Sequence, residues 1–169
     1  KKSQFPFDDS KINSDNYLKF IVEELKPYID KKYSVFTTAN HTAIMGSSMG
    51  GLISMYALCE YPNVFGKAVC LSTHWIGFRE FDNNPIPESF FAYLEKKLPE
   101  AKNHKIYFDY GTETLDAFYI KYEYRVDEIL KAKGYMDVDS RNLKFEGENH
   151  SEASWQKRIH IPLEFMFGK

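Results

Sequence analysis

Apolar positions recur along this chain with two periods, one helical and one strand-like. A loop over residues 1–14 is followed by a predicted helix over about 15–30, whose apolar positions recur every three or four residues behind an N-cap at Ser14-Asp15. Pro27 is late in this segment and is expected to mark its final turn. Short apolar runs predict strands over about residues 42–46, 65–72, 104–110 and 143–146.

Helical segments separate and follow these strands. They are predicted over about residues 49–61, 88–98, 115–133 and 151–167. Strands that alternate with helices, without hairpin signals, favour a parallel sheet with helices on both faces. We therefore predict an α/β three-layer sandwich that forms a single domain over residues 1–169.

The segment between the first strand and the next helix reads Gly46-Ser47-Ser48-Met49-Gly50. This pattern in this context is typical of a nucleophile elbow, a sharp strand-to-helix turn that presents a strained serine. Gly46 and Gly50 are expected to remove collisions with the neighbouring strand and helix. Ser48 is the candidate nucleophile, and the backbone N–H of Met49 is the candidate oxyanion donor. The alternative is an ordinary Gly/Ser-rich turn.

A serine hydroxyl needs a base, and in parallel sheets functional residues collect at the carboxyl edge. His150 follows the last strand and opens the last helix, which makes it the first candidate. His74 follows the second strand and is the other candidate base, and it could also line the substrate pocket. For His150 the alternative is a helix N-terminal residue without catalytic role. The remaining histidines lie before strands or inside the last helix: His41, His104 and His160.

The acid that orients the base is expected after the third strand, where both Glu113 and Asp116 are within reach. Asp116 is favoured, and the residue that is not the acid would complement the dipole at the start of a helix. Asp109, inside the strand, is expected to be structural. The order Ser48, acid, His150 is the α/β-hydrolase order.

Composition narrows the classes of function. The net charge is −2 and both signs are mixed along the 169 residues, which argues against a nucleic-acid-binding surface. No apolar run approaches the ~20 residues that a membrane span requires. Cys59 and Cys70 have no Cys-x-x-Cys partner and are interpreted as buried free thiols, and we predict neither a metal nor a cofactor. We expect a soluble protein, cytoplasmic, or periplasmic or secreted if a signal peptide was removed.

Three segments resemble a known family. Gly46 to Gly51, Tyr107 to Thr112, and Asn149 to Glu152 with Trp155 and Arg158 resemble the putative esterase family of α/β-hydrolases. That family includes enterochelin esterase-like, feruloyl esterase-like and S-formylglutathione hydrolase-like proteins, and the resemblance is strongest to bacterial members described as hydrolases or esterases. It covers the chain from about residue 15 to the end.

The resemblance implies an α/β-hydrolase fold and the hydrolysis of carboxylic esters through an acyl-serine. It implies Ser48 as nucleophile and His150 as base, and it does not decide between Asp116 and Glu113. The family has several strands before the nucleophile strand, whereas about 40 residues precede it here. We therefore expect the C-terminal part of a longer domain, with a second oxyanion donor outside this chain. The strand over 42–46 would then be a sheet edge, through which we expect self-association.

The sequence thus predicts a serine esterase that acts on a small-molecule or sugar-linked ester. An acyltransferase with the same residues, or a non-catalytic carbohydrate- or partner-binding module on the same fold, remains the alternative. Trp75, with Phe78 and Phe81 in the same loop, is a candidate wall of the substrate pocket, and its alternative role is core packing.

Overall fold

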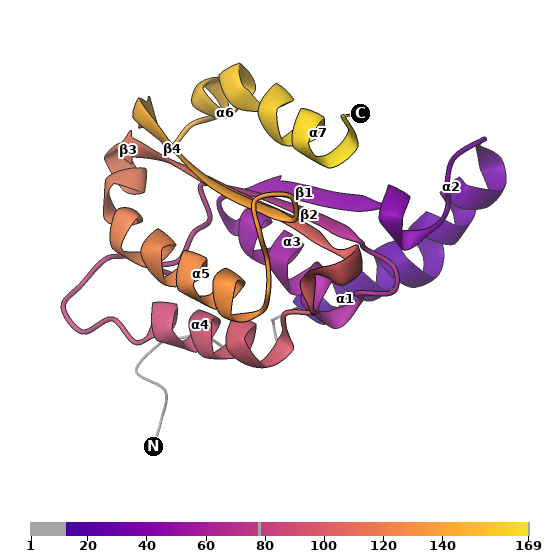
Figure 1. Cartoon of the computed structure of the whole chain (residues 1–169), viewed down its shortest axis with the longest axis horizontal. Coiled ribbons are helices and arrows are strands. Elements are labelled where there is room, and N and C mark those ends of the chain that lie inside the picture. Colours follow the sequence, from indigo (N-terminus) through magenta and orange to yellow (C-terminus); the bar gives the residue numbers. More distant parts are fainter. Residues whose placement is uncertain (1–12, 78, 169) are drawn as a thin grey trace. The chain divides into compact units, whose positions relative to one another are not determined.

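The structure of the protein is a computed structural model that describes residues 13–77 and 79–168 (Figure 1). Most of the predicted N-terminal loop, and Phe78, lie outside these residues. The chain divides after Thr37 into two compact units. Among the described residues, no helix is both long and apolar enough to cross a bilayer.

The first unit contains one continuous helical segment. It runs through α1 (Ser14–Lys19), a π-helical stretch, η2 (Phe20–Leu25), and α2 (Lys26–Lys32), which confirms the predicted helix. Pro27 does not mark the final turn, since it lies at the start of α2. Proline lacks an N–H and crowds the carbonyl four residues earlier, and the wider π-helical stretch just before it accommodates this crowding.

The second unit is built on a four-stranded parallel sheet, as predicted, and its strands lie side by side in chain order. The two inner strands are β2 and β3, so β1 and β4 are its edges. The predicted self-association through the edge at β1 stays a prediction. The strands are β1 (Ala43–Ser47), β2 (Lys67–Leu71), β3 (Lys105–Glu113) and β4 (Ser140–Asn149).

The last two strands extend further than their apolar runs. β3 and β4 pair from Ile106–Ser140 to Glu113–Asn149, with an irregularity between Gly111 and Glu113. Backbone hydrogen bonds keep these polar strand ends paired. Such bonds do not depend on side-chain polarity, so the pattern of apolar residues does not predict them.

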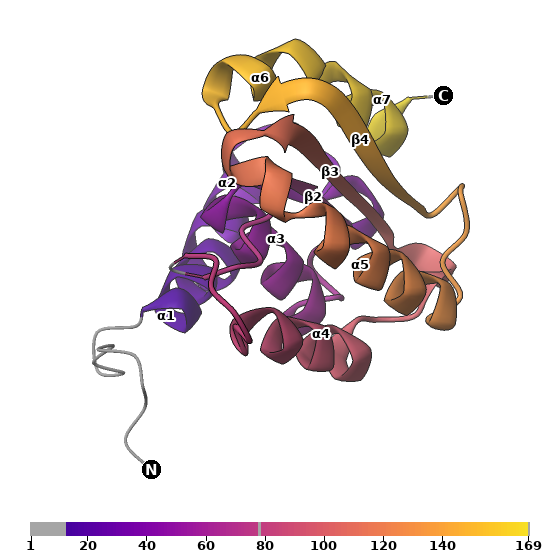
Figure 2. The ribbon, with the colours of Figure 1, turned by 90° about the vertical axis from the view of Figure 1, so that its left-hand side faces the viewer.

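Helices cover both faces of the sheet, which confirms the three-layer prediction. The crossover helices α3, α4 and α5 lie on one face, as expected when strands are added in one direction by connections of one hand. Helices α6 and α7 cover the other face (Figures 1 and 2). The bounds are α3 (Met49–Glu60), α4 (Ile86–Lys97), α5 (Ile120–Ala132), α6 (Glu152–Arg158) and α7 (His160–Phe167), with short 3₁₀ turns η3 (Ala39–His41), η4 (Ala101–Asn103) and η5 (Thr114–Phe118).

The predicted last helix is two helices, because α6 ends at Arg158 and α7 begins at His160. Pro162 lies in the first turn of α7, and its missing N–H cannot bond to the carbonyl four residues earlier, that of Arg158. The break turns the chain between the two helices. As a result α6 lies beside the carboxyl ends of the strands and α7 packs on the sheet (Figure 2).

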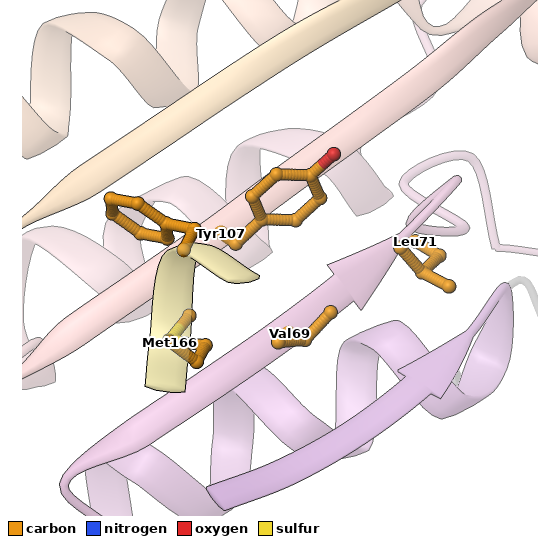
Figure 3. Close-up of a cluster of buried hydrophobic side chains, with 5 residues drawn as sticks. Val69, Leu71, Tyr107 and Met166 are labelled. Atoms are coloured by element: carbon orange, nitrogen blue, oxygen red, sulfur yellow. The ribbon is translucent and has the colours of Figure 1, made fainter. Parts of the chain in front are cut away.

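The core beneath α7 is apolar. Val69, Leu71 and Tyr107 project from one face of β2 and β3 against Phe165 and Met166 of α7 (Figure 3). Alternate residues of β2 face the opposite side of the sheet, where α3 packs. Cys70 is one of them, and both cysteines are buried free thiols as predicted. Burial raises the pKa of the Cys59 thiol to about 12.

A second, aromatic core lies under α4 and α5. Trp75 is 0% exposed and its ring packs against Phe91 and Phe108. Its indole Nε1 donates to Oε1 of Glu123 over 2.7 Å. The structure therefore places Trp75 in the core and not on the wall of a pocket. A long aromatic loop residue gives the same sequence signal in either role, and the buried hydrogen-bond partner on α5 is visible only in three dimensions.

The glycines of the turn between β1 and α3 are not equivalent. A Cβ at Gly46 would lie 2.5 Å from the carbonyl carbon and oxygen of Gly50, which no side chain tolerates. A Cβ at Gly50 would meet nothing within 4 Å, so the predicted steric role of that glycine is wrong. The close contact is between Gly46 and the backbone of residue 50. Gly51 is also constrained, since its Cβ would lie 2.9 Å from Oγ1 of Thr73.

Gly46→Ala is expected to destabilise the fold by about 1–3 kcal/mol, the usual cost of overpacking. Gly50→Ala is the matched control, expected to be neutral or to stabilise by up to about 1 kcal/mol because alanine favours a helix more than glycine does. Urea unfolding followed by circular dichroism measures both. Equal destabilisation by the two substitutions would contradict the assignment.

The buried carboxyl group of Glu123 is expected to make the stability of the fold depend on pH. Its side chain is 1% exposed, one oxygen accepts from Trp75, and Oε2 has no partner among the residues described. Burial raises the pKa of Glu123 from 4.5 to about 8. Between these values the folded protein holds a proton that the unfolded chain has lost, so stability falls as the pH rises.

Glu123→Gln keeps an acceptor for Trp75 and removes this titration. Over pH about 5 to 8 the free energy of unfolding of the wild type is expected to fall more steeply than that of the variant, by at most about 1.4 kcal/mol per pH unit. Urea unfolding at three pH values in this window measures the two slopes. Parallel curves would show that Glu123 stays ionised in the folded protein.

Candidate active site

Ser48 is held at the turn between β1 and α3 with φ 55° and ψ −118°. This conformation is costly for a residue with a side chain, and it persists only where surrounding contacts enforce it. The N–H of Ser48 donates to the carbonyl of Leu71 on β2 over 2.8 Å. Its carbonyl accepts from the N–H of Gly51 over 3.0 Å. The serine is therefore fixed by the neighbouring strand and by the first turn of α3.

His150 follows β4 and reaches this serine. Its Nε2 lies 2.9 Å from Oγ of Ser48, and its side chain is 13% exposed. Its backbone N–H donates to Oγ1 of Thr114 over 3.0 Å. The ring is held edge-on by Trp155, at 5.1 Å between centroids. The helix after it is capped by Ser151, so His150 precedes the cap and lies outside the first turn.

Asp116 lies in η5 and is 0% exposed. Its Oδ1 is 2.5 Å from Nδ1 of His150. Its Oδ2 accepts from the N–H of Gly111 and from the hydroxyl of Ser72, both over 2.6 Å. Residue 111 must be glycine, because a Cβ there would lie 2.1 Å from the carbonyl oxygen of Glu148.

Glu113 has a different position. It is the last residue of β3, it pairs with Asn149 in the ladder, and its side chain is exposed. Of the two carboxylates that the sequence left open, the structure brings Asp116 to the imidazole of His150.

The hydrogen bonds set the tautomer of His150. An ionised carboxylate only accepts, so Asp116 requires the proton of the imidazole on Nδ1. The lone pair of Nε2 then faces the hydroxyl of Ser48. Such an arrangement can take the hydroxyl proton, because the buried negative charge of Asp116 stabilises the imidazolium that results.

Met49 begins α3 directly after Ser48. Its side chain is 63% exposed, and no described residue accepts a hydrogen bond from its backbone N–H. The first N–H groups of a helix are unpaired and carry a partial positive charge. The N–H of Met49 is therefore available to an anionic atom bound to the serine.

His74 lies beside this group without contacting Ser48 through its ring. The rings of His74 and His150 are 6.3 Å apart between centroids. Its Nε2 donates to the carbonyl oxygen of Gly77, so its Nδ1 accepts from the hydroxyl of Tyr119 over 2.8 Å. Burial lowers the pKa of His74. His74 is thus a neutral neighbour of the site with both ring nitrogens engaged.

Two other histidines form hydrogen bonds away from Ser48. His41 pairs with Oγ1 of Thr38 before β1, and His104 bonds to the carbonyls of Glu100 and Pro62 before β3. Both therefore lie at the amino edge of the sheet, as predicted. Within the described ranges, no cluster of His, Cys, Asp and Glu is suited to hold a metal.

Sequence reasoning gave no role to Ser72 or Thr114. Ser72 directly follows β2, and Thr114 directly follows β3. Each has a positive φ, 42° and 55° respectively. Their position after a strand was the available signal, but serine and threonine are so common in loops that position alone does not distinguish them.

Solved structures with a similar fold are named as esterases or hydrolases. The enterobactin esterase FES from Shigella flexneri superimposes with a TM-score of 0.72 at 16% identity, covering 90% of this chain and 38% of that one. The ferulic acid esterase AmCE1/Fae1A from Anaeromyces mucronatus gives 0.67 at 20% identity, covering 91% and 55%. S-formylglutathione hydrolase from Staphylococcus aureus gives 0.63 at 16% identity, covering 90% and 65%. These likenesses show a shared α/β-hydrolase fold.

Two curated relatives come from Bacillus subtilis (strain 168). Uncharacterized protein YbbA is 25% identical over 162 residues, which are 91% of this chain and 60% of that protein. Uncharacterized protein YjcH is 26% identical over 100 residues, 59% of this chain and 37% of that protein. The chain thus spans less than two thirds of the length of either relative.

A family model covers most of the sequence. The model described as "Putative esterase" matches residues 6–162, which include all three positions of the hydrogen-bonded series Ser48, His150 and Asp116. The chain therefore belongs to the Putative esterase family.

Proposed function

We propose that this protein hydrolyses carboxylic esters through an acyl-serine intermediate on Ser48, with His150 as the base and Asp116 as the orienting acid. The observation that carries the proposal is the unbroken series of two hydrogen bonds. They join Oγ of Ser48 to Nε2 of His150 over 2.9 Å, and Nδ1 of His150 to Oδ1 of Asp116 over 2.5 Å.

In the first half of the proposed reaction, Nε2 of His150 takes the hydroxyl proton while Oγ of Ser48 attacks the ester carbonyl. The carbonyl π electrons move to oxygen, and the N–H of Met49 donates to the oxyanion that forms. A second donor would complete the oxyanion hole. The imidazolium then protonates the leaving alcohol as the tetrahedral intermediate collapses to the acyl-serine.

In the second half, His150 takes a proton from water while its oxygen attacks the acyl carbonyl. The imidazolium returns the proton to Oγ of Ser48, and the carboxylic acid leaves. Asp116 stays ionised and holds the imidazole in one orientation throughout. No step requires a cofactor.

Membership of the Putative esterase family supports ester hydrolysis as the reaction class. Two of the similar structures are named as esterases of different compounds, enterobactin and ferulic acid. We propose a small-molecule or sugar-linked ester as the substrate class. His74 is the candidate for the substrate-binding wall, since its ring lies 6.3 Å from that of His150.

Ser48→Ala is expected to lower kcat/KM for a p-nitrophenyl ester by at least about 10³-fold, because the nucleophile is lost. Ser47→Ala, one residue earlier on β1, is the matched control and is expected to stay within about twofold. A fluorophosphonate probe followed by mass spectrometry should label Ser48 in the wild type. Unchanged hydrolysis by Ser48→Ala would refute the nucleophile, and a folded wild type without label would favour a binding module.

A pair of isosteric substitutions tests the acid. Asp116→Asn is expected to lower kcat by about 10²–10⁴-fold, because the amide can present an N–H to the imidazole and select the wrong tautomer. Glu113→Gln is expected to stay within about twofold, since that side chain is exposed. Steady-state kinetics with the same ester measures both. The opposite ranking would assign the role to Glu113.

A further inference from the structure

A buried polar cluster lies behind Asp116, and no residue of it takes part in the proposed reaction. Ser72, Trp155 and Arg158 meet there, the first from the end of β2 and the other two from α6. Trp155 and Arg158 belong to the motif that follows His150 in the sequence. Ser72 is 0% exposed and Arg158 is 2% exposed, whereas Trp155 is partly exposed.

The hydroxyl of Ser72 has its full set of hydrogen bonds. Its oxygen accepts from Nε1 of Trp155 and from a terminal nitrogen of Arg158, each over 2.9 Å. Both partners can only donate, so they occupy the two lone pairs of the hydroxyl. Its single proton then has one acceptor, Oδ2 of Asp116 at 2.6 Å. The direction of this hydrogen bond is therefore fixed by its surroundings.

Arg158 is itself held in place. Its Nε and one terminal nitrogen donate to the carboxylate of Asp109, over 3.2 Å and 2.8 Å. The hydroxyl of Tyr107 donates to the same carboxylate over 3.2 Å. Burial raises the pKa of Asp109, and the bonds from Arg158 and Tyr107 oppose that effect. This ion pair neutralises the guanidinium and anchors it against β3.

The backbone of Ser72 is fixed as tightly as its side chain. Its N–H donates to the carbonyl of Asp109 over 2.8 Å, and φ is 42°. Three of the four described non-glycine residues with positive φ, Ser48, Ser72 and Thr114, bond into the series that ends at Asp116. Strain of this kind gathers where surrounding contacts hold a side chain in place for function.

We propose that Ser72 is a positioning residue for Asp116. Trp155 and Arg158 hold its hydroxyl, which with the N–H of Gly111 saturates Oδ2 of Asp116 and leaves Oδ1 aimed at His150. The inference rests on the proposed function and adds a residue that acts on the reaction through Asp116. It also assigns a role to the motif after His150, because Trp155 and Arg158 of α6 are the two donors that orient the hydroxyl.

Ser72→Gly is the sharpest variant, since glycine tolerates a positive φ and loses only the side chain. We expect kcat for a p-nitrophenyl ester to fall by about 10–100-fold with KM within about twofold, because the acid loses its orientation and substrate binding is untouched. Ser54→Ala is the matched control. It removes another buried hydroxyl, one that donates to the carbonyl of Gly50 inside α3, and should keep kcat within about twofold.

A double-mutant cycle separates positioning from a merely structural role. If Ser72 acts through Asp116, Ser72→Gly should cause no further loss of kcat in the Asp116→Asn background. A structural role would lower kcat by the same factor in both backgrounds. Should Ser72→Gly not fold, Ser72→Ala removes the same hydroxyl, and its expected loss of kcat should likewise vanish beside Asp116→Asn.

Proton NMR supplies a readout that needs no turnover. The Nδ1 proton of His150 should give a low-field resonance that Asp116→Asn abolishes, and Ser72→Gly should move it upfield. An unchanged resonance together with wild-type kcat, or an equal loss beside Asp116→Asn, overturns the proposal. The failure of the proposed function has a different signature, which is unchanged hydrolysis by Ser48→Ala. In that case the resonance alone still decides the role of Ser72.

Discussion

The buried carboxylate of Asp116 is the group on which the rest of this site depends. A charge removed from water costs several kcal/mol unless hydrogen bonds replace its hydration. Here the replacements come from the N–H of Gly111, the hydroxyl of Ser72 and the imidazole of His150. Each donor belongs to a different strand or its following loop, so the carboxylate fixes three strand ends relative to one another.

The sheet makes this convergence possible. Its four parallel strands follow one another in chain order, and every crossover returns the chain to the same edge. Ser48, Ser72, Asp116 and His150 each follow a different strand at that edge. Ser48 and His150 are 102 positions apart in the chain, yet their side chains are hydrogen-bonded.

Buried charge is handled differently on the two faces of the sheet. Beneath α6, Asp109 is paired with Arg158, and the pair is linked through Ser72 to the acid of the proposed triad. Under α5, Glu123 has no ion pair with any of the described residues, and burial raises its pKa to about 8. The first arrangement holds Asp109 against a guanidinium that also bonds to Ser72. The second keeps a proton at neutral pH and fixes the indole of Trp75 in the core.

The sequence by itself determined the order of strands and helices, the sharp turn at Ser48 and the histidine after the last strand. These features are local, because apolar periodicity and the spacing of small residues are set by the steric demands of neighbouring positions. Only the tertiary structure shows that Asp116, and not Glu113, contacts the imidazole of His150. It alone also shows that Trp75 is buried in the core and which groups bond to Ser72. Those outcomes depend on which groups lie within about 3 Å of one another in space. For residues that are far apart in the chain, the local sequence pattern does not indicate such a contact.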